Sequence, residues 1–230
     1  MLNRKSAFAA FWIFTLALFT VATARVIYYT PDEATMGPIQ KVFYLHLPVA
    51  INTFLACLVT FVASIGYLSS RTSWWDDLAS AAARVSVQLC TIVLLTGMIW
   101  GKCAWGQWWT WSPRLTFSLV LWLLYTVYLI IRSSIESAER RALISAVYAI
   151  IAFLDVPLVY LSVRLMPDIH PASIELAPEM KLTLATWFAA VTVFTAGLIA
   201  AKYGLNRMER GLLSRSEQNA QVAAVGGFAC

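Results

Sequence analysis

The chain has 230 residues, of which 60% are hydrophobic and only 13% are charged, and its mean hydropathy is +0.70. A soluble domain usually carries about 25% charged residues, so this composition excludes an ordinary soluble protein and indicates an integral membrane protein. The net charge of +5 does not indicate nucleic-acid binding, because no stretch interleaves basic and aromatic residues as an RNA-binding face does. In a membrane protein, the location of the positive charges reports orientation instead.

Six apolar segments follow one another along the chain, each long enough to cross a bilayer, which takes about 20 residues. The first resembles a signal peptide, with Arg4 and Lys5 before it, but we expect it to be retained as a helix. We therefore predict an all-α, polytopic membrane protein in which residues 1–205 form one domain and residues 206–230 a flexible tail. The six predicted transmembrane spans are residues 8–28, 42–68, 78–100, 115–131, 142–163 and 182–203.

The positive charges predict which side of the membrane each loop faces. With six spans, both termini lie on one side, and eleven of the seventeen lysines and arginines fall on that side or at nearby helix ends. The other side holds the remaining six. Since cytoplasmic loops carry the excess of basic residues, we expect both termini in the cytoplasm and the loops after the first, third and fifth spans outside.

Several common chemistries have no motif in this sequence. The four cysteines form no C-x-x-C pair, which argues against thiol–disulfide exchange, and no C-x-x-C-H, which excludes a c-type cytochrome. The sequence has no phosphate-binding G-x-x-x-x-G-K-[S/T] loop, so any ATP hydrolysis must come from another chain. No Ser/His/Asp or zinc-protease pattern is present, and we expect a protein that is not an enzyme.

Tryptophans crowd into the loop between the third and fourth spans. Five of the ten lie in the segment from Trp100 to Thr116, which reads W-G-K-C-A-W-G-Q-W-W-T-W-S-P-R-L-T. An interfacial aromatic belt explains some of them, because indoles favour that depth, but it does not explain why half lie in one loop. Helical spacing places Trp105, Trp108 and Trp109 on one side of a short interfacial helix. With Trp111, these rings are predicted to form a platform for a planar apolar ligand with a charged rim.

The chain has two histidines, His46 and His170. His46 begins the second span and His170 lies between the fifth and sixth, so both are expected in the same outer layer as the tryptophans. Neutral imidazoles are the usual axial ligands of haem iron, and the pair predicts a bis-histidine haem site. The alternative, for each histidine alone, is a hydrogen-bonded surface group. Zinc is disfavoured because it takes three or four ligands, and no close cluster of His, Cys and carboxylates appears.

Two outward cations lie near the predicted haem edge. Lys41 lies five residues before His46, and Arg114 follows the tryptophans. Both are predicted to pair with haem propionates, with snorkelling of the side chain to the membrane surface as the alternative. Lys102 and Lys181 are weaker candidates of the same kind.

Polar side chains that fall well inside the predicted spans include Asp155, Arg84 and Gln88, and ionisable groups at such depths are costly and often functional. Asp155 lies two residues before Pro157, which bends the helix, and its carboxyl is expected to be protonated or bonded to Ser, Thr or Tyr across the bundle. Arg84 and Gln88 share one face of the third span, because they are four residues apart. We expect Arg84 either to pair with an aspartate of residues 76–77 or to face a partner subunit.

Three patches occur in the order found in the haem-handling membrane proteins of cytochrome c biogenesis, which carry a tryptophan-rich "WWD" signature. They are Y-L-H-L-P at Tyr44–Pro48, W-G-x-W-W-x-W at Trp105–Trp111 with R-L-T at Arg114–Thr116, and the histidine loop around His170. With the six spans, they make nearly the whole chain resemble the CcmC family of system I. One position departs from the signature: Ser112 stands where the family usually has Asp. Whatever that Asp does in the family, a serine could do only the uncharged part of it.

This resemblance implies a protein of the bacterial inner membrane that binds haem b at the periplasmic face, between His46 and His170, and delivers it to a periplasmic haem chaperone. It also implies partners besides the surrounding lipid: an ABC ATPase subunit, a second membrane subunit and a very small membrane subunit. Two alternatives remain. One is a single-haem membrane cytochrome b acting as a redox subunit, and the other is a transporter or scaffold subunit without a cofactor.

Overall fold

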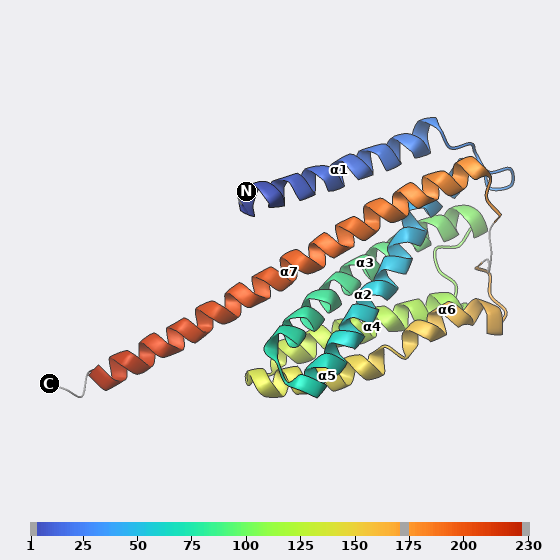
Figure 1. Cartoon of the computed structure of the whole chain (residues 1–230). Coiled ribbons are helices and arrows are strands. Elements are labelled where there is room, and N and C mark those ends of the chain that lie inside the picture. Colours follow the sequence, from blue (N-terminus) through green and yellow to red (C-terminus); the bar gives the residue numbers. More distant parts are fainter. Residues whose placement is uncertain (1–3, 171–174, 227–230) are drawn as a thin grey trace.

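The structure, a computed structural model, describes residues 4–170 and 175–226, and this part of the chain is helical without a β-strand. Six of its helical segments are long and apolar enough to cross a membrane, which confirms the predicted all-α fold with six spans (Figure 1). In chain order the elements are α1 (Arg4–Tyr28), the 3-10 helix η1 (Pro38–Val42), α2 (Phe43–Ser70), α3 (Ser73–Trp105), α4 (Pro113–Ser134), α5 (Ala138–Ala152), α6 (Asp155–Leu165) and α7 (Pro178–Gly226).

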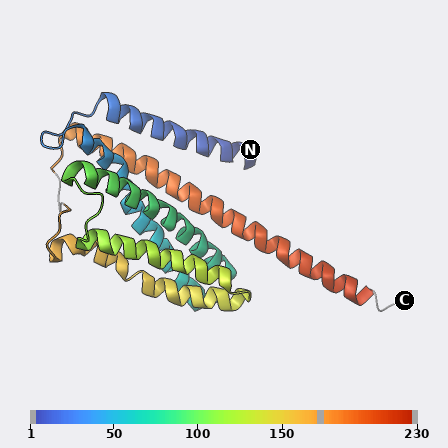
Figure 2. The same ribbon diagram turned by 180° about the vertical axis from the view of Figure 1, so that it is seen from behind.

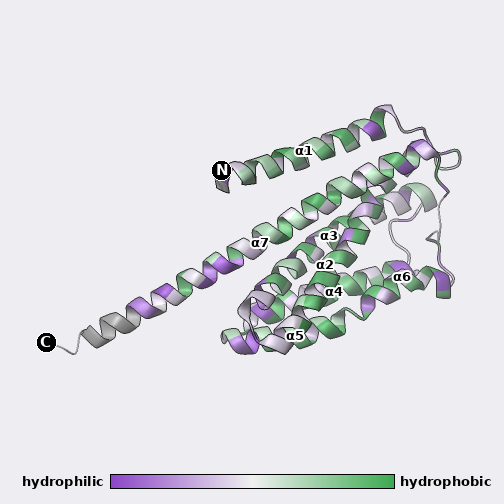
Figure 3. Ribbon diagram, viewed as in Figure 1, coloured by the Kyte–Doolittle hydropathy of each residue, from purple (hydrophilic) through white to green (hydrophobic). Residues whose placement is uncertain are grey.

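Hydrophobic residues run along all the spanning helices, including their outward surfaces (Figure 3). On the outer surface of the bundle, large apolar side chains remain exposed, including Ile13 at 68%, Ile130 at 56% and Leu165 at 72%. In lipid, every backbone N–H and C=O group must be satisfied within its own segment, so apolar stretches of this length become helices. An exposed apolar surface of this kind suits contact with lipid or with another membrane helix.

The pair formed by α2 and α3 lies at the centre of the bundle (Figure 1). On one side of this pair lie α4, α5 and α6, and on the other lies α7, which packs against α1. The loops of residues 29–37, 106–112 and 166–170 gather at one end of the bundle, here called the loop end (Figures 1 and 2). The connectors 71–72 and 135–137 lie at the opposite end, as six spans require.

The predicted fifth span, residues 142–163, is two helices rather than one. A turn at residues 153–154 separates α5 from α6. In a continuous helix, Pro157 would leave the carbonyl of Phe153 without a partner, because proline has no N–H. Instead, Val156 N–H donates to that carbonyl at 3.0 Å, and the proline stands in the first turn of a new helix, where proline is tolerated. The turn lays α6 along α4, so that α6 forms part of the cavity wall described below.

Asp155 begins α6 and is buried inside the bundle. Its Oδ2 atom has no hydrogen-bond partner among the described residues, so the predicted bond from this oxygen to a hydroxyl across the bundle is not formed. The helix break places Asp155 in the first turn of a helix, where the positive end of the helix dipole favours a carboxylate.

Two buried aspartates join three helices at the end opposite the loops. Asp76 of α3 accepts bonds from both terminal nitrogens of Arg132 on α4, at 2.5 and 3.0 Å. Asp77, the next residue, accepts a bond from Arg210 of α7 at 2.6 Å. The predicted pairing of Arg84 with these aspartates is wrong: within the described chain, no salt bridge reaches Arg84. The aspartates are taken by cations from neighbouring helices.

The last helix is longer than the predicted span. α7 continues through residues 206–226, which were expected to be a separate flexible tail, while residues 227–230 lie outside the described residues. Hydrophilic residues appear along the part of α7 that leaves the bundle (Figure 3). Asn206 fastens this part to α3 by donating to the backbone carbonyl of Asp77 at 3.0 Å and to Ser80 Oγ at 2.8 Å.

Candidate ligand-binding site

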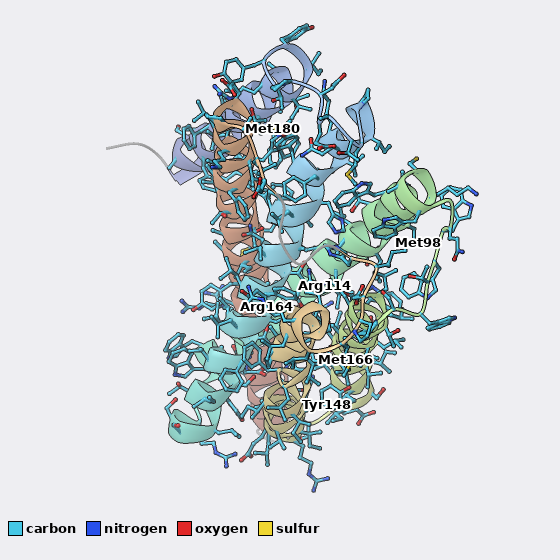
Figure 4. All side chains as sticks on the ribbon, turned by 90° about the vertical axis from the view of Figure 1, so that its right-hand side faces the viewer. Met98, Arg114, Tyr148, Arg164, Met166 and Met180 are labelled. Atoms are coloured by element: carbon cyan, nitrogen blue, oxygen red, sulfur yellow. The ribbon has the colours of Figure 1, made fainter. Side chains whose placement is uncertain are left out.

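A cavity bounded by α2, α3, α4 and α6 opens at the loop end. It holds about 1330 Å³ of atom-free space, including its opening to solvent. The deeper part is mostly apolar and reaches Cys90, ten residues before Trp100 on α3, which is roughly 15 Å along a helix axis. Figure 4 looks onto the loop end and shows Arg114 and Arg164 near the centre of this view. The polar and aromatic residues of the outer wall include His46, Trp100, Trp105, Trp109, Arg114, Tyr160, Arg164 and His170.

His46 lies in the first turn of α2, and its ring is fixed against α3. Its Nδ1 lies 2.9 Å from Thr96 Oγ1, and that hydroxyl donates its own proton to the carbonyl of Ile92 at 2.7 Å. With that donation, the hydroxyl oxygen accepts the proton of Nδ1, and Nε2 of a neutral ring then keeps a free lone pair. Metal-binding histidines commonly donate their other ring N–H in this way.

A glycine makes this close approach possible. A Cβ atom at position 97 of α3 would lie 3.3 Å from Cε1 of His46, which is tighter than most real contacts. Gly97 therefore lets the imidazole lie against the α3 backbone, beside Thr96. The sequence did not indicate either residue, because both lie about 50 positions from His46 along the chain.

His170 is held in a different way, by groups from a loop and from α4. Arg114 Nη1 lies 3.4 Å from His170 Nδ1, and Arg114 Nη2 donates to the carbonyl of Tyr160 at 3.2 Å. A guanidinium can only donate, so in this contact Nδ1 accepts and the neutral ring carries its proton on Nε2. The two histidines therefore have opposite tautomers, and only His46 presents an unprotonated Nε2.

One carboxylate ties the histidine loop to the start of α4. Asp168 Oδ2 accepts the backbone N–H of Arg114 at 2.7 Å, while Oδ1 accepts the backbone N–H of His170 at 2.8 Å. Ser112 is the N-cap residue of α4 but makes no side-chain cap bond, and its buried hydroxyl has no partner in the described chain. Asp168 thus caps the helix in place of Ser112, from 54 residues away.

Asp168 was not among the predicted site residues, although it carries one local signal. The side chain of an Asp often accepts the backbone N–H of the residue two positions later. Asp168 and His170 have this spacing. The bond to Arg114, in contrast, is visible only in the tertiary structure.

Trp100 contacts both imidazoles. Its ring makes edge contacts with His46, at a centroid distance of 5.8 Å, and with His170, at 6.4 Å. Trp105 makes a further edge contact with His170 at 6.4 Å. The structure therefore brings both histidines to one cavity at one end of the bundle, each in contact with a nearly buried indole.

The predicted short helix carrying Trp105, Trp108 and Trp109 is not formed. α3 ends at Trp105, because Gly106 adopts a left-handed backbone conformation (φ 75°) that terminates the helix. Residues 106–112 then run without a helix to the start of α4. Trp105 and Trp109 line the cavity, whereas Trp108 and Trp111 are 55% and 75% exposed on the loop.

The predicted lysines point elsewhere. Lys41 lies in η1 and pairs with Asp32 at 2.9 Å, away from the cavity wall. Lys102 donates to the carbonyl of Gly106 at 3.0 Å, which caps the end of α3. Of the predicted cations, Arg114 is the one in the wall, and the structure adds Arg164, which the sequence analysis did not select.

The chemistry of the wall fits a planar, apolar, anionic ligand that contains a metal. The indole Nε1 atoms of Trp100 and Trp109 and Nε of Arg114 are buried without hydrogen-bond partners in the described chain. Buried donors of this kind normally find an acceptor, so polar groups of a ligand fit this part of the wall. The described residues contain no cluster of three or more His, Cys, Asp or Glu side chains able to hold a bare metal ion.

The fold and the cavity define a class: a polytopic helical membrane protein with a cavity lined by histidine and tryptophan at its loop end. The chain belongs to the CcmC family, described as heme exporter protein C, which it matches over residues 2–223.

Curated relatives carry the same description. The heme exporter protein C of Rhodobacter capsulatus is 32% identical over 142 residues, which cover 61% of this chain and 59% of the relative. That of Paracoccus denitrificans is 34% identical over 122 residues, or 53% of this chain and 51% of the relative. That of Escherichia coli K12 is 26% identical over 199 residues, or 85% and 79%. The matched part thus spans little more than half the length of the first two relatives.

Proposed function

We propose that this protein handles haem in cytochrome c maturation. It holds haem b at the periplasmic face of the inner membrane and delivers it to a periplasmic haem chaperone, with both termini in the cytoplasm. One observation carries the proposal: two histidines from separate elements, His46 and His170, reach the same cavity beside one indole. The family of heme exporter proteins supports the choice of haem as the cargo.

His46 is the proposed first iron ligand. Its Nδ1 proton is directed at Thr96, and Nε2 keeps the lone pair that an axial ligand needs. When haem is bound, this nitrogen would donate its lone pair to the iron. Because α2 and α3 fix the ring from both sides, His46 needs no rearrangement before it binds.

His170 is the proposed second ligand, and its binding requires a change in its partners. Arg114 must leave Nδ1, so that the ring proton can move from Nε2 to Nδ1, before the ring can coordinate through Nε2. A propionate group offers Arg114 a carboxylate in place of an imidazole, and charge-assisted bonds of this kind are the stronger ones. Arg114 and Arg164 are thus proposed to bind propionates and, in doing so, to release His170.

The tryptophans divide into two proposed roles. Trp105 and Trp109, in the cavity wall, pack on the porphyrin, since aromatic faces suit a flat apolar ring. Trp108 and Trp111 are exposed and present an aromatic surface to the incoming chaperone. Lys41 is left out of the proposed site because it pairs with Asp32.

Transfer, rather than catalysis, is the proposed task. The chaperone's own ligand replaces the more mobile of the two histidines, and energy from ATP comes from a separate ATPase subunit that acts with a second and a small membrane subunit. A cytochrome b that carries electrons across the bilayer usually needs haems at two depths, whereas both histidines here lie at the loop end.

The proposal is tested by optical spectroscopy of the purified full chain expressed with haem available. The expected result is a Soret band with low-spin bis-histidine features, which is lost in the His46→Ala/His170→Ala double variant. A colourless wild-type preparation, or a double variant with an unaltered spectrum, contradicts the proposal. Addition of the purified chaperone should then move haem to the chaperone, measured by separating the two proteins; rapid haem reduction by a quinol would instead favour the cytochrome b.

A further inference from the structure

One face of α3 is exposed between α4 and α7, on the side of the helix turned away from the residues that line the histidine cavity. Trp122 of α4 bonds to Thr91 beside this face, at 2.9 Å, and Asn206 of α7 bonds to Ser80 near its inner end, at 2.8 Å. The exposed residues recur every three or four positions and so form a single stripe along the helix, here called the α3 face: Arg84, Gln88, Ile92, Leu95 and Ile99.

Arg84 stands at the inner end of the α3 face without a counter-ion in the described chain. The acidic residues that precede it on α3, Asp76 and Asp77, are already bound by Arg132 and Arg210. Arg84 lies eight residues beyond Asp76, which is roughly 12 Å further along the helix axis. It is therefore an unpaired cation within a membrane span, and such residues usually face a partner or a polar path.

The order of polar and apolar residues along the α3 face, and its length, indicate what kind of partner covers it. Gln88 lies one turn beyond Arg84 and adds an amide that needs hydrogen bonds in lipid. Beyond it, Ile92, Leu95 and Ile99 are 38%, 56% and 49% exposed and continue the stripe toward the loop end. A lipid headgroup lies at the membrane surface and matches only the Arg84 end. A helix lying along α3 matches the whole stripe, which is roughly 22 Å long.

We propose that the α3 face binds a transmembrane helix of another subunit, and that this helix carries an Asp or Glu that pairs with Arg84. The same helix offers a hydrogen-bonding group to Gln88 and apolar side chains to the rest of the stripe. The carboxylate neutralises a cation that has no counter-ion among the described residues, so the pair specifies both the partner and its depth. This interface is separate from the haem site and does not depend on it.

The test uses the full chain in its native membrane, with Gln88 replaced by the photocross-linker benzoylphenylalanine. The expected adduct joins position 88 to a membrane-spanning peptide of a different polypeptide, identified by mass spectrometry and containing Asp or Glu. Arg84→Leu should lower the yield of this adduct at least fivefold, whereas Arg84→Lys should keep most of it. Reversing both charges, with Arg84→Glu and Lys in place of the partner's carboxylate, should restore the yield.

Three outcomes overturn the proposal: adducts with phospholipid alone, adducts with a second copy of this chain, or a yield that does not change with Arg84→Leu. The same cross-linker at Ile151, which is 62% exposed on α5, is the matched control, and its adducts should not depend on Arg84. The Soret band of the Arg84→Leu variant should equal that of the wild type, which separates a loss of the interface from misfolding and from failure of the haem proposal.

Discussion

The two sides of the cavity hold their histidines in contrasting ways. On the α2–α3 side, His46 stands on a helix, bonds to Thr96 at 2.9 Å and lies against Gly97. On the α4–α6 side, His170 stands on a loop, and its ring contacts Arg114 at 3.4 Å. The helix side keeps one tautomer and one position, because each of its contacts comes from a continuous helix. On the loop side, the hydrogen-bond partners of His170 come from its own loop and from the start of α4.

This contrast assigns different tasks to the two ligands. A ligand that is already oriented binds tightly, since little freedom is lost on binding. A ligand that must first exchange a partner binds less tightly and is easier to displace. His46 is therefore the retaining ligand in our proposal, and His170 is the ligand that yields to the chaperone.

The largest expected effect separates the two histidines. Loss of a residue that only hydrogen-bonds to a metal ligand typically weakens metal binding by about 10- to 100-fold. His46→Ala removes the ligand itself and should therefore lower haem affinity by more than about 100-fold. His170→Ala should keep a weaker five-coordinate haem, because the oriented ligand remains. Haem content per protein and the Soret position measure both effects. Equal losses in the two variants would remove the proposed difference between the sides.

The next effect concerns the hydrogen bond that orients His46. Thr96→Val removes the acceptor of the Nδ1 proton while keeping the shape, and should weaken haem binding by about tenfold or more. Thr96→Ser keeps the hydroxyl and should bind haem nearly as the wild type does. Haem titration followed by absorbance provides the measurement. If the valine variant matched the serine variant, the bond to Thr96 would not orient the ligand.

A smaller effect is expected from the carboxylate of the loop side. Asp168→Asn leaves one acceptor oxygen for two backbone N–H groups, and a lost bond to a charged group costs about 1.5–3 kcal/mol. Part of this free energy goes into disordering the loop and does not weaken haem binding. The affinity for haem should therefore fall by less than in Thr96→Val. Faster haem transfer to the chaperone should accompany the loss. Asp32→Asn, which changes a carboxylate of the same end outside the cavity, is the control and should do neither.

The smallest effect tests the contact between His46 and the α3 backbone. Gly97→Ala adds a methyl group that lies 3.3 Å from the ring, so the imidazole must shift by a few tenths of an ångström. The expected result is a change in the electron paramagnetic resonance g-values of the ferric haem, with affinity reduced by about 1 kcal/mol. Gly204→Ala, where a Cβ meets nothing within 4 Å, should leave both unchanged.

Much of the fold was predictable because each span is a local solution. A run of about 20 apolar residues must satisfy its own backbone in lipid, so hydropathy alone indicates six helices. The limits of that approach appear at Pro157, where the predicted bend is a complete break, and in α7, which runs past the predicted span to Gly226. The break follows from the missing N–H of Pro157, and most of the extension of α7 lies beyond the part that packs in the bundle.

The candidate site was predictable in its residue types but not in its contacts. Two histidines, Trp105, Trp109 and Arg114 were selected for their chemistry, and all of them line the cavity. The interfacial helix was wrong because Gly106 ends α3, and Lys41 pairs with Asp32 instead of approaching the cavity.

The sequence by itself determined the class of this protein, its number of spans and the imidazoles and indoles available for a planar ligand, because these follow from composition and local spacing. Only the tertiary structure decided which groups hydrogen-bond to the histidines and to the residues around them. Thr96 lies 50 residues from His46, and Asp168 lies 54 from Arg114, so neither partner has a local signature. Hydrogen bonds over such separations exist only after the helices have packed, and they set the tautomers of the two histidines.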